Sequence, residues 1–284
     1  MAIFSNQATL TYNGNSTNSN IAYGEILDVL AATKTAFEGS YTPGALVTYV
    51  VTLRNTGTPA LTGVTVTDDL GGYTLNGTTV YPLTYEAGSA ALFSNGVPQP
   101  APAVTAGPPL AVSGLTIPAN GDLVLVYQAR ANGFADPGLE GTIVNTVTAT
   151  GDGISTPVTA TETVTGTIAP ALTITKSISP AQVVDNDRVT YTFVIQNSGN
   201  AAVDAAGNAS ITDVFDPILT ALMVTFEGAS WTEGVQYTYN AATGLFTTLP
   251  GAITVPAATY TRDPATGEYT VTPGVVTLTV TGTI

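Results

Sequence analysis

The chain has 284 residues and a formal net charge of −14, with only 6 Lys and Arg residues and no Cys or His. A chain this acidic and this poor in cations excludes nucleic acid and anionic membrane surfaces as partners. The missing Cys and His exclude disulfides, the commonest metal ligands and most catalytic machinery. We therefore expect no enzyme activity beyond self-catalysed bond formation, no cofactor and no metal.

Composition predicts an all-β protein. Hydrophobic residues make up 44% and charged residues 9%, which is typical of a folded chain, and 29 Gly and 18 Pro interrupt stretches rich in β-branched residues. The length is typical of two domains. No apolar run reaches the roughly 20 residues of a membrane span, so we expect no insertion into a membrane.

The N-terminus has no basic segment followed by an apolar one, as a signal peptide would have. Two interpretations remain open. The sequence begins at a mature end, or the protein assembles in the cytosol and is released by lysis, as a spore appendage would be. In both cases we expect an extracellular location, on a cell or spore surface.

The first predicted element is a strand over Ile3–Gly14, which has no partner nearby in the sequence. Its pattern of Asn, a spacer, a small apolar residue, Thr, an apolar residue and Thr recurs at Ile143–Gly151. We expect residues 1–14 to be a donor strand and residues 15–29 to be a flexible linker. The more apolar parity of the strand, expected to face inward, consists of Phe4, Asn6, Ala8, Leu10 and Tyr12.

Domain 1 is predicted over residues 30–168. Leu46–Leu53 alternates as a half-buried strand does, and Leu123–Ala129 is a continuous apolar run typical of a central strand. A loop rich in Pro and Ala is expected at Val97–Leu110. Further strands are predicted at Gly63–Asp68, Tyr81–Tyr85 and Ile143–Thr150.

Domain 2 is predicted over residues 169–284 as a second copy of the same unit. The matched pairs Asn6 and Asn145, Lys34 and Lys176, and Asp68 and Asp213 are separated by 139, 142 and 145 positions. No copy of the Asn145 strand follows, so we expect domain 2 to lack its last strand. The matching segments of the second copy are Leu172–Ser177, Val189–Ile195, Ser210–Asp213, Phe226-Glu227 and Val275–Val280.

Both copies resemble a known family. The run TKTAFEGSYTPGALVTYVVTLRNTGTPALTGVTVTDDL and its partner ITKSISPAQVVDNDRVTYTFVIQNSGN, followed by SITDVFD, share a Thr-Lys opening, an Asn-Thr-Gly or Asn-Ser-Gly turn and a Thr-Asp strand end. These features resemble the conserved repeat domain (domain of unknown function eleven) of bacterial and archaeal surface proteins. The resemblance implies two Ig-like, Greek-key β-sandwiches with a structural surface role. Its usual closing strand is present in domain 1, at Asn145-Thr146-Val147-Thr148, and absent from domain 2.

A missing edge strand predicts self-assembly. A sandwich that lacks a strand exposes unpaired backbone groups and an apolar groove, and an extended segment can dock there by β-strand addition. Because donor and acceptor lie at opposite ends of the chain, the contact is heterologous and builds an open filament. We therefore expect a head-to-tail homopolymer: a structural fibre or pilus subunit. The alternative is a monomeric adhesion or spacer module whose N-terminal strand folds back onto its own domain 2.

Lys34 and Lys176 are the only lysines, and they occupy the same position of the repeat. Each is expected on a first strand beside the last strand that carries the asparagine. A lysine, an asparagine and a buried acid are the components of the isopeptide bonds found in pilins of Gram-positive bacteria. The alternative is that the lysines are ordinary surface residues. The candidates are Lys34, Asn145, Asp68 and Glu86 within a subunit, and Lys176, Asn6, Asp213 and Glu227 between subunits.

Two weaker candidates remain. The acidic turn Asp185-Asn186-Asp187 lacks the spacing of a calcium loop, and we interpret it as a turn. Aromatic residues of the second copy either line a glycan-binding patch or pack the sandwich, and the sequence leaves both open. They are Trp231, Tyr239, Tyr260 and Tyr269.

Overall fold

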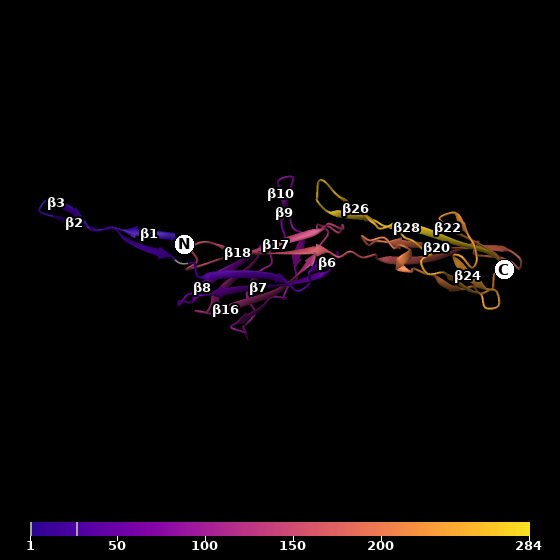
Figure 1. Cartoon of the computed structure of the whole chain (residues 1–284), viewed down its shortest axis with the longest axis horizontal. Helices are drawn as coiled ribbons and strands as arrows, with labels where there is room; N and C mark the ends of the chain where they lie inside the picture. The colour runs from indigo at the N-terminus through magenta and orange to yellow at the C-terminus, as the bar shows by residue number, and fades with distance from the viewer. Residues whose placement is uncertain (1, 27) are drawn as a thin grey trace. The chain divides into compact units, whose positions relative to one another are not determined.

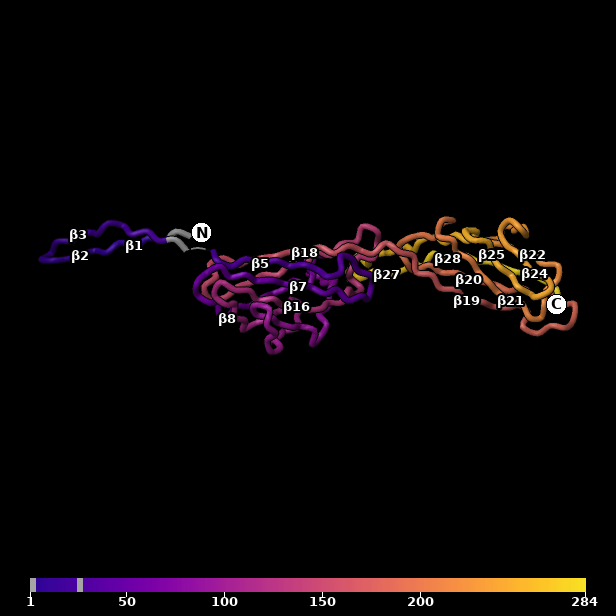
Figure 2. The backbone as a smooth tube through the Cα atoms, turned by 60° about the horizontal axis from the view of Figure 1, so that its bottom comes forward, coloured from indigo at the N-terminus to yellow at the C-terminus, as the bar shows by residue number. Residues whose placement is uncertain are grey.

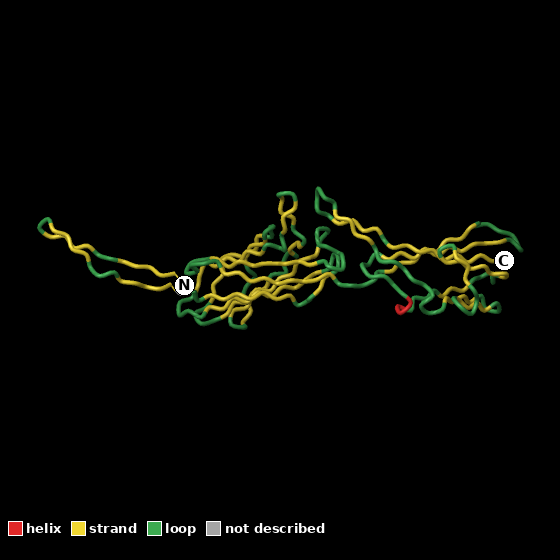
Figure 3. Tube along the Cα trace, turned by 45° about the horizontal axis from the view of Figure 1, so that its top comes forward, coloured by secondary structure: helices red, strands yellow, loops and turns green. Residues whose placement is uncertain are grey.

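The computed structural model describes residues 2–26 and 28–284. The part it describes is nearly all strand, with a single short 3₁₀ helix, η1 (Ala205–Gly207) (Figure 3). The chain divides into two compact units. Unit 1 comprises Met1–Asp136 and Gly141–Thr165, and unit 2 comprises Pro137–Glu140 and Gly166–Ile284. The all-β fold class is therefore confirmed.

One sheet of unit 1 has the order β13-β12-β16-β7-β5, with β11 also paired with β16. Figure 2 labels three of its strands, β5, β7 and β16. Its two central strands alternate buried and less buried residues, as period-two patterning predicts. Their inward side chains form one face of the core. The strands are β5 (Leu30–Ala36), β7 (Leu46–Asn55), β11 (Leu83–Tyr85), β12 (Ala91–Ser94), β13 (Val97–Pro98) and β16 (Asp122–Ala131).

The other sheet of unit 1 has the order β14-β15-β8-β17-β18-β6. Tyr49 and Leu125 from the first sheet and Val66 and Val147 from this one belong to the same buried core, so unit 1 is a β-sandwich. Its strands are β6 (Ser40–Tyr41), β8 (Leu61–Asp68), β14 (Ala103–Thr105), β15 (Leu110–Ile117), β17 (Thr142–Thr150) and β18 (Val158–Gly166), and a separate hairpin joins β9 (Tyr73–Leu75) to β10 (Thr78–Val80).

Unit 2 repeats this plan with fewer strands. Its larger sheet has the order β19-β20-β28-β22-β23, and its smaller sheet has only β21-β25-β24. The core lies between them, with Phe193 and Leu278 from one sheet and Phe246 from the other. The strands are β19 (Leu172–Ser179), β20 (Arg188–Asn197), β21 (Thr212–Val214), β22 (Thr220–Phe226), β23 (Ala229–Trp231), β24 (Tyr237–Asn240), β25 (Leu245–Thr248), β26 (Thr259–Arg262), β27 (Tyr269–Thr272) and β28 (Gly274–Thr283).

The N-terminal segment is a two-armed hairpin (Figures 1 and 3). Strand β1 (Ala2–Asn6) pairs with β4 (Ala22–Ile26), and β2 (Thr9–Tyr12) pairs with β3 (Asn15–Asn18). Residues 15–29, expected to be a flexible linker, therefore contain the return strands. The cause is the turn: Asn13 and Gly14 both have positive φ, at 44° and 77°, as a tight hairpin turn of this kind requires.

A buried asparagine is the last residue of β7 in unit 1 and of β20 in unit 2. Nδ2 of Asn55 donates to the carbonyls of Pro59 and Pro118, at 2.9 and 3.0 Å, and its Oδ1 accepts the N–H of Gly57 at 2.9 Å. Asn197 makes the corresponding bonds in unit 2. The Asn-X-Gly motif common to the two copies is thus a structural corner that holds three loop groups.

We expect Asn55→Ala to lower the free energy of unfolding of unit 1 by about 2–4 kcal/mol, because buried backbone groups lose their partners. Calorimetry measures this, with the fluorescence of the single tryptophan, Trp231, marking the transition of unit 2. Asn197→Ala is the matched control and should shift the Trp231 transition instead. A loss below about 1 kcal/mol in unit 1 would show that water replaces the side chain at the corner.

Candidate functional site

Lys34 lies on β5 with its side chain inside unit 1. Its Nζ is 2.6 Å from Oδ2 of Asp68, and the two side chains are 0% and 2% exposed. The same Nζ is 4.7 Å from the ring centre of Tyr49 and 5.9 Å from that of Tyr127. A buried charge needs an opposite charge and polar contacts to stay in the core. Lys34 is therefore held as an ion pair beside two aromatic rings.

The ion pair continues into a network that reaches Asn145. Oδ1 of Asp68 accepts the N–H of Leu70 at 2.8 Å, and Oδ2 also accepts the hydroxyl of Tyr127. Nδ2 of Asn145 is 3.5 Å from that hydroxyl. Oδ1 of Asn145 and the hydroxyl of Tyr49 are buried without a hydrogen-bond partner among the residues the structure describes. The network thus contains a buried amide whose carbonyl oxygen is unpaired.

Burial sets the protonation of this site. Burial lowers the pKa of Lys34, and the negative charge of Asp68 opposes part of that shift. Burial also raises the pKa of Tyr127 well above its ordinary value, with the charge of Asp68 acting in the same direction. Burial thus makes the Lys34 ammonium of the ion pair easier to deprotonate than that of an exposed lysine, and it keeps the proton on Tyr127.

The structure brings Lys34, Asp68 and Asn145 into one buried network, with Tyr127 between the acid and the amide. We expected the lysine strand and the asparagine strand to be neighbours, and this prediction is wrong. Strand β5 pairs with β7, whereas β17 pairs with β8 and β18 in the opposite sheet. The lysine and the asparagine therefore approach each other across the sandwich, because alternation turns both side chains inward.

Two residues of the site escaped the sequence analysis, and one proposed acid lies elsewhere. Tyr49 and Tyr127 are directly opposite each other on β7 and β16, and their rings stack at 5.5 Å. The signal was present, since both lie at inward positions of strongly alternating strands. Glu86 instead pairs with Arg130 at 3.0 Å, and both side chains are partly exposed.

The matching site of unit 2 is open to solvent. Lys176 pairs with Asp213, but their side chains are 39% and 18% exposed. Nζ of Lys176 lies 4.5 Å from the ring centre of Tyr191, the counterpart of Tyr49. Val280 lies opposite Tyr191, where unit 1 has Tyr127, so this site lacks the second hydroxyl.

Glu227, the second acid proposed for unit 2, lies outside that site. Its carboxylate accepts the backbone N–H of Thr277, and the residue is exposed. Asp213 is the acid that pairs with Lys176.

Unit 2 is open because one sheet edge has no partner. In unit 1, β8 is paired with β15 on one side and β17 on the other. Its counterpart β21 is paired with β25, and its other edge faces no strand of the described chain. Across the sandwich, β19 carries Lys176, which pairs with Asp213 of β21. Two apolar side chains of β19 are exposed, Ile174 at 52% and Ile178 at 41%, whereas their counterparts Ala32 and Ala36 pack on the core of unit 1.

The N-terminal hairpin carries the matching surface. In β17 the buried residues are Ile143, Asn145, Val147 and Ala149, alternating with less buried ones. Their counterparts in the N-terminal hairpin lie on the face that we expected to be buried, but that face is exposed in this structure. Its members are Phe4, Asn6, Ala8, Leu10 and Tyr12.

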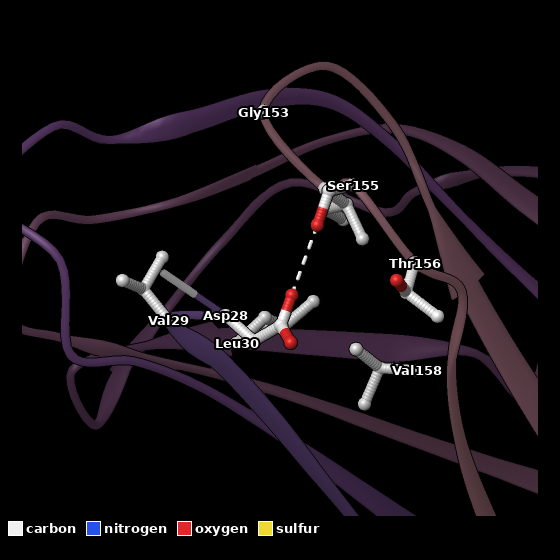
Figure 4. A pocket seen from close by; sticks show the side chains of 8 residues that line it. Asp28, Val29, Leu30, Gly153, Ser155, Thr156 and Val158 are labelled. Atoms are coloured by element: carbon white, nitrogen blue, oxygen red, sulfur yellow. Dashed lines mark hydrogen bonds between the residues drawn. The ribbon is translucent and has the colours of Figure 1, made fainter. Parts of the chain in front are cut away.

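The end of the hairpin is tied to unit 1 (Figure 4). Oγ of Ser155, in the turn between β17 and β18, donates to Oδ1 of Asp28 at 2.9 Å, and these residues line a small pocket. The carbonyl of Val29 accepts the N–H of Thr56 at 2.8 Å. The chain therefore leaves the hairpin beside the β17–β18 turn.

The remaining candidates are mostly structural. Trp231 stacks on Phe226 with ring centres 5.0 Å apart, and the hydroxyls of Tyr239 and Tyr260 donate to backbone carbonyls. Tyr269 lies beside the guanidinium of Arg262. In residues 2–26 and 28–284, no three acidic side chains gather as a metal site would require. No helix of that part is long and apolar enough to cross a membrane.

Comparisons with known proteins found similarity in structure only. No protein family and no curated protein matches the sequence. The chain is similar to the N-terminal domain of the Streptococcus gordonii adhesin Sgo0707 (16% identity, 54% of this chain, TM-score 0.36) and to the pilus backbone of Streptococcus pneumoniae (13%, 86%, 0.36). It spans 36% and 55% of those chains. It is also similar to the full-length major pilin SpaD of Corynebacterium diphtheriae (10%, 86% of this chain and 59% of that one, 0.37).

Proposed function

We propose that this protein is a structural subunit of a self-assembling extracellular or spore-surface fibre, built of two conserved repeat domains. Each copy inserts its N-terminal strand beside β21 of the next copy. One observation carries the proposal: β17 closes unit 1, whereas unit 2 has no strand at the corresponding edge. The N-terminal segment has the same alternating pattern as β17, but the residues that match the buried ones of β17 are exposed. Open edges and exposed apolar faces of this kind favour β-strand addition.

The closed unit supplies the register of the proposed joint. In unit 1, Thr148 lies opposite Thr67, with Ala149 opposite Val66. Carried over by the repeat, Thr9 would lie opposite Thr212, and Leu10 opposite Ile211. This register places Asn6 over Lys176 and Asp213, as Asn145 lies over the Lys34 pair.

The strand is proposed to come from a second copy, because of where the hairpin leaves unit 1. Its exit is held beside the β17–β18 turn by Asp28 and Val29. The chain continues to unit 2 after Thr165, at the other end of β18. The hairpin thus begins at the end of unit 1 remote from the connection to its own unit 2, which favours exchange between copies over folding back.

We further propose that isopeptide bonds lock the fibre. After the Lys34 ammonium passes a proton to Asp68, its Nζ attacks Cγ of Asn145; the Nζ–Cγ bond forms, the Cγ–Nδ2 bond breaks, and Nδ2 leaves as ammonia with the proton that Nζ gives up in forming the amide. Asp68 is placed to accept and return a proton, because it already touches Nζ and the Tyr127 hydroxyl. At the joint, Lys176 and Asp213 would act in the same way on Asn6 of the next copy.

Leu10→Asp is expected to block assembly, because it would place a charge where Ala149 is fully buried in the closed unit. Thr11→Asp is the matched control: its counterpart Thr150 is exposed, so fibres should still form. Negative-stain microscopy and pelleting measure both. Fibres from Leu10→Asp that equal the wild type would overturn strand exchange, and a wild type that stays monomeric would support the spacer or adhesion module instead.

A further inference from the structure

Unit 1 is closed by a hairpin, not by one strand. Strands β17 and β18 pair continuously, from Thr142 opposite Thr165 to Ala149 opposite Val158. The outer strand also contributes to the core, since Val164 is fully buried. A single donor strand would therefore replace only half of the element that closes a unit of this fold.

The N-terminal segment offers both halves, in nearly the same register. Phe4 lies opposite Gly24 and Asn6 opposite Ala22. The corresponding pairs of unit 1 are Ile143 with Val164, and Asn145 with Glu162. Each strand that carries the asparagine is thus followed by a return strand at a matching distance.

The side chains of the first pair are complementary in size. A Cβ atom added to Gly24 would lie 2.2 Å from Cζ of Phe4, so the phenyl ring covers the space that a side chain at position 24 would need. In unit 1 the same pair is two medium-sized residues, Ile143 and Val164. The large-and-small pair and the medium-and-medium pair fill similar volumes, which is what a common site requires.

We propose that residues 2–26 enter unit 2 of a second copy as an intact hairpin, with β1 and β2 beside β21 and with β3 and β4 as the outer strands. This proposal rests on the proposed strand exchange and identifies the whole hairpin, rather than one strand, as the segment that docks. The order of elements along the chain supports it. The closing hairpin of unit 1 ends at Gly166 and the next sandwich begins shortly after, at Leu172; in the same way, the N-terminal hairpin ends at Ile26 and the next sandwich begins at Leu30. Each joint would then repeat the order of elements already present inside the chain.

The test is a double-mutant cycle in the full-length chain, measured as the critical concentration for assembly in a pelleting assay. Gly24→Val should raise that concentration about tenfold or more, because the new side chain overlaps the Phe4 ring in the docked core. Phe4→Ile should raise it by a smaller factor through lost apolar contact. The double variant recreates the pair of unit 1 and should return to within about threefold of the wild type.

The outcomes separate the two proposals. If only the first strand docks, the hairpin has to open and position 24 stays outside the joint; Gly24→Val would then leave the critical concentration unchanged or lower it, and it would not rescue Phe4→Ile. That result overturns the hairpin while Leu10→Asp still blocks assembly. If Leu10→Asp assembles like the wild type, strand exchange itself fails, and the hairpin with it.

Discussion

Wild-type fibres boiled in SDS are expected to run as a ladder of multimers, and Asn6→Ala fibres are expected to collapse to monomer. Docking should survive the substitution, because backbone pairing and the apolar face hold the strand, but Lys176 would have no amide to attack. Electrophoresis of sedimented fibres measures this. Covalent joints would give a chain without cysteine the resistance that other surface proteins obtain from disulfides.

Three variants complete this test. Lys176→Ala and Asp213→Ala should also give fibres that dissolve in hot SDS. Lys34→Ala changes only unit 1, so it should keep the ladder and restore the mass of one ammonia to each subunit. Wild-type fibres that collapse fully to monomer of plain sequence mass would show that neither unit forms an isopeptide bond.

Asp68→Ala is expected to lower the free energy of unfolding of unit 1 by about 3–5 kcal/mol, because it leaves the buried ammonium of Lys34 without its counter-charge. It would also remove the acceptor of the Tyr127 hydroxyl. Denaturant titration measures the loss in monomer whose Lys34–Asn145 bond has not formed, which the intact mass verifies. The measurement does not depend on assembly, so it tests the buried site by itself.

Asp213→Ala is the matched control for that experiment. Its ion pair with Lys176 is partly exposed, so solvent screens it and the loss in unit 2 of the monomer should stay below about 1 kcal/mol. Equal losses in the two units would contradict the view that unit 1 is closed and unit 2 open. The double variant Lys34→Met/Asp68→Ala should recover much of the stability, since it removes the unpaired charge as well.

Local pattern was enough for the main strands of the two sandwiches and their inward faces, but not for the return strands β3 and β4. Because side chains alternate with a period of two, Leu46–Leu53 could be assigned one inward face, and Lys34, Asp68 and Asn145 could be matched to Lys176, Asp213 and Asn6 by position in the repeat. The Asn13-Gly14 turn is also a local feature, because this dipeptide with positive φ at both residues makes a two-residue hairpin turn. The sequence therefore contained the signal for a hairpin, but we interpreted it only as the end of a strand.

Only the tertiary structure decided which strands meet. Parity says which face a residue is on, but not which strand lies opposite, so the pairing of β5 with β7 and of β17 with β8 could not be derived. For the same reason the sequence could not exclude Glu86 as the acid of the lysine site, although it pairs with Arg130. Nor could it show that Tyr127 belongs to the site, with its hydroxyl between Asp68 and Asn145. The repeat predicted that unit 2 lacks its closing strand, but only the tertiary structure decided that the uncovered edge belongs to β21, because strand neighbours are set by chain segments far apart in the sequence.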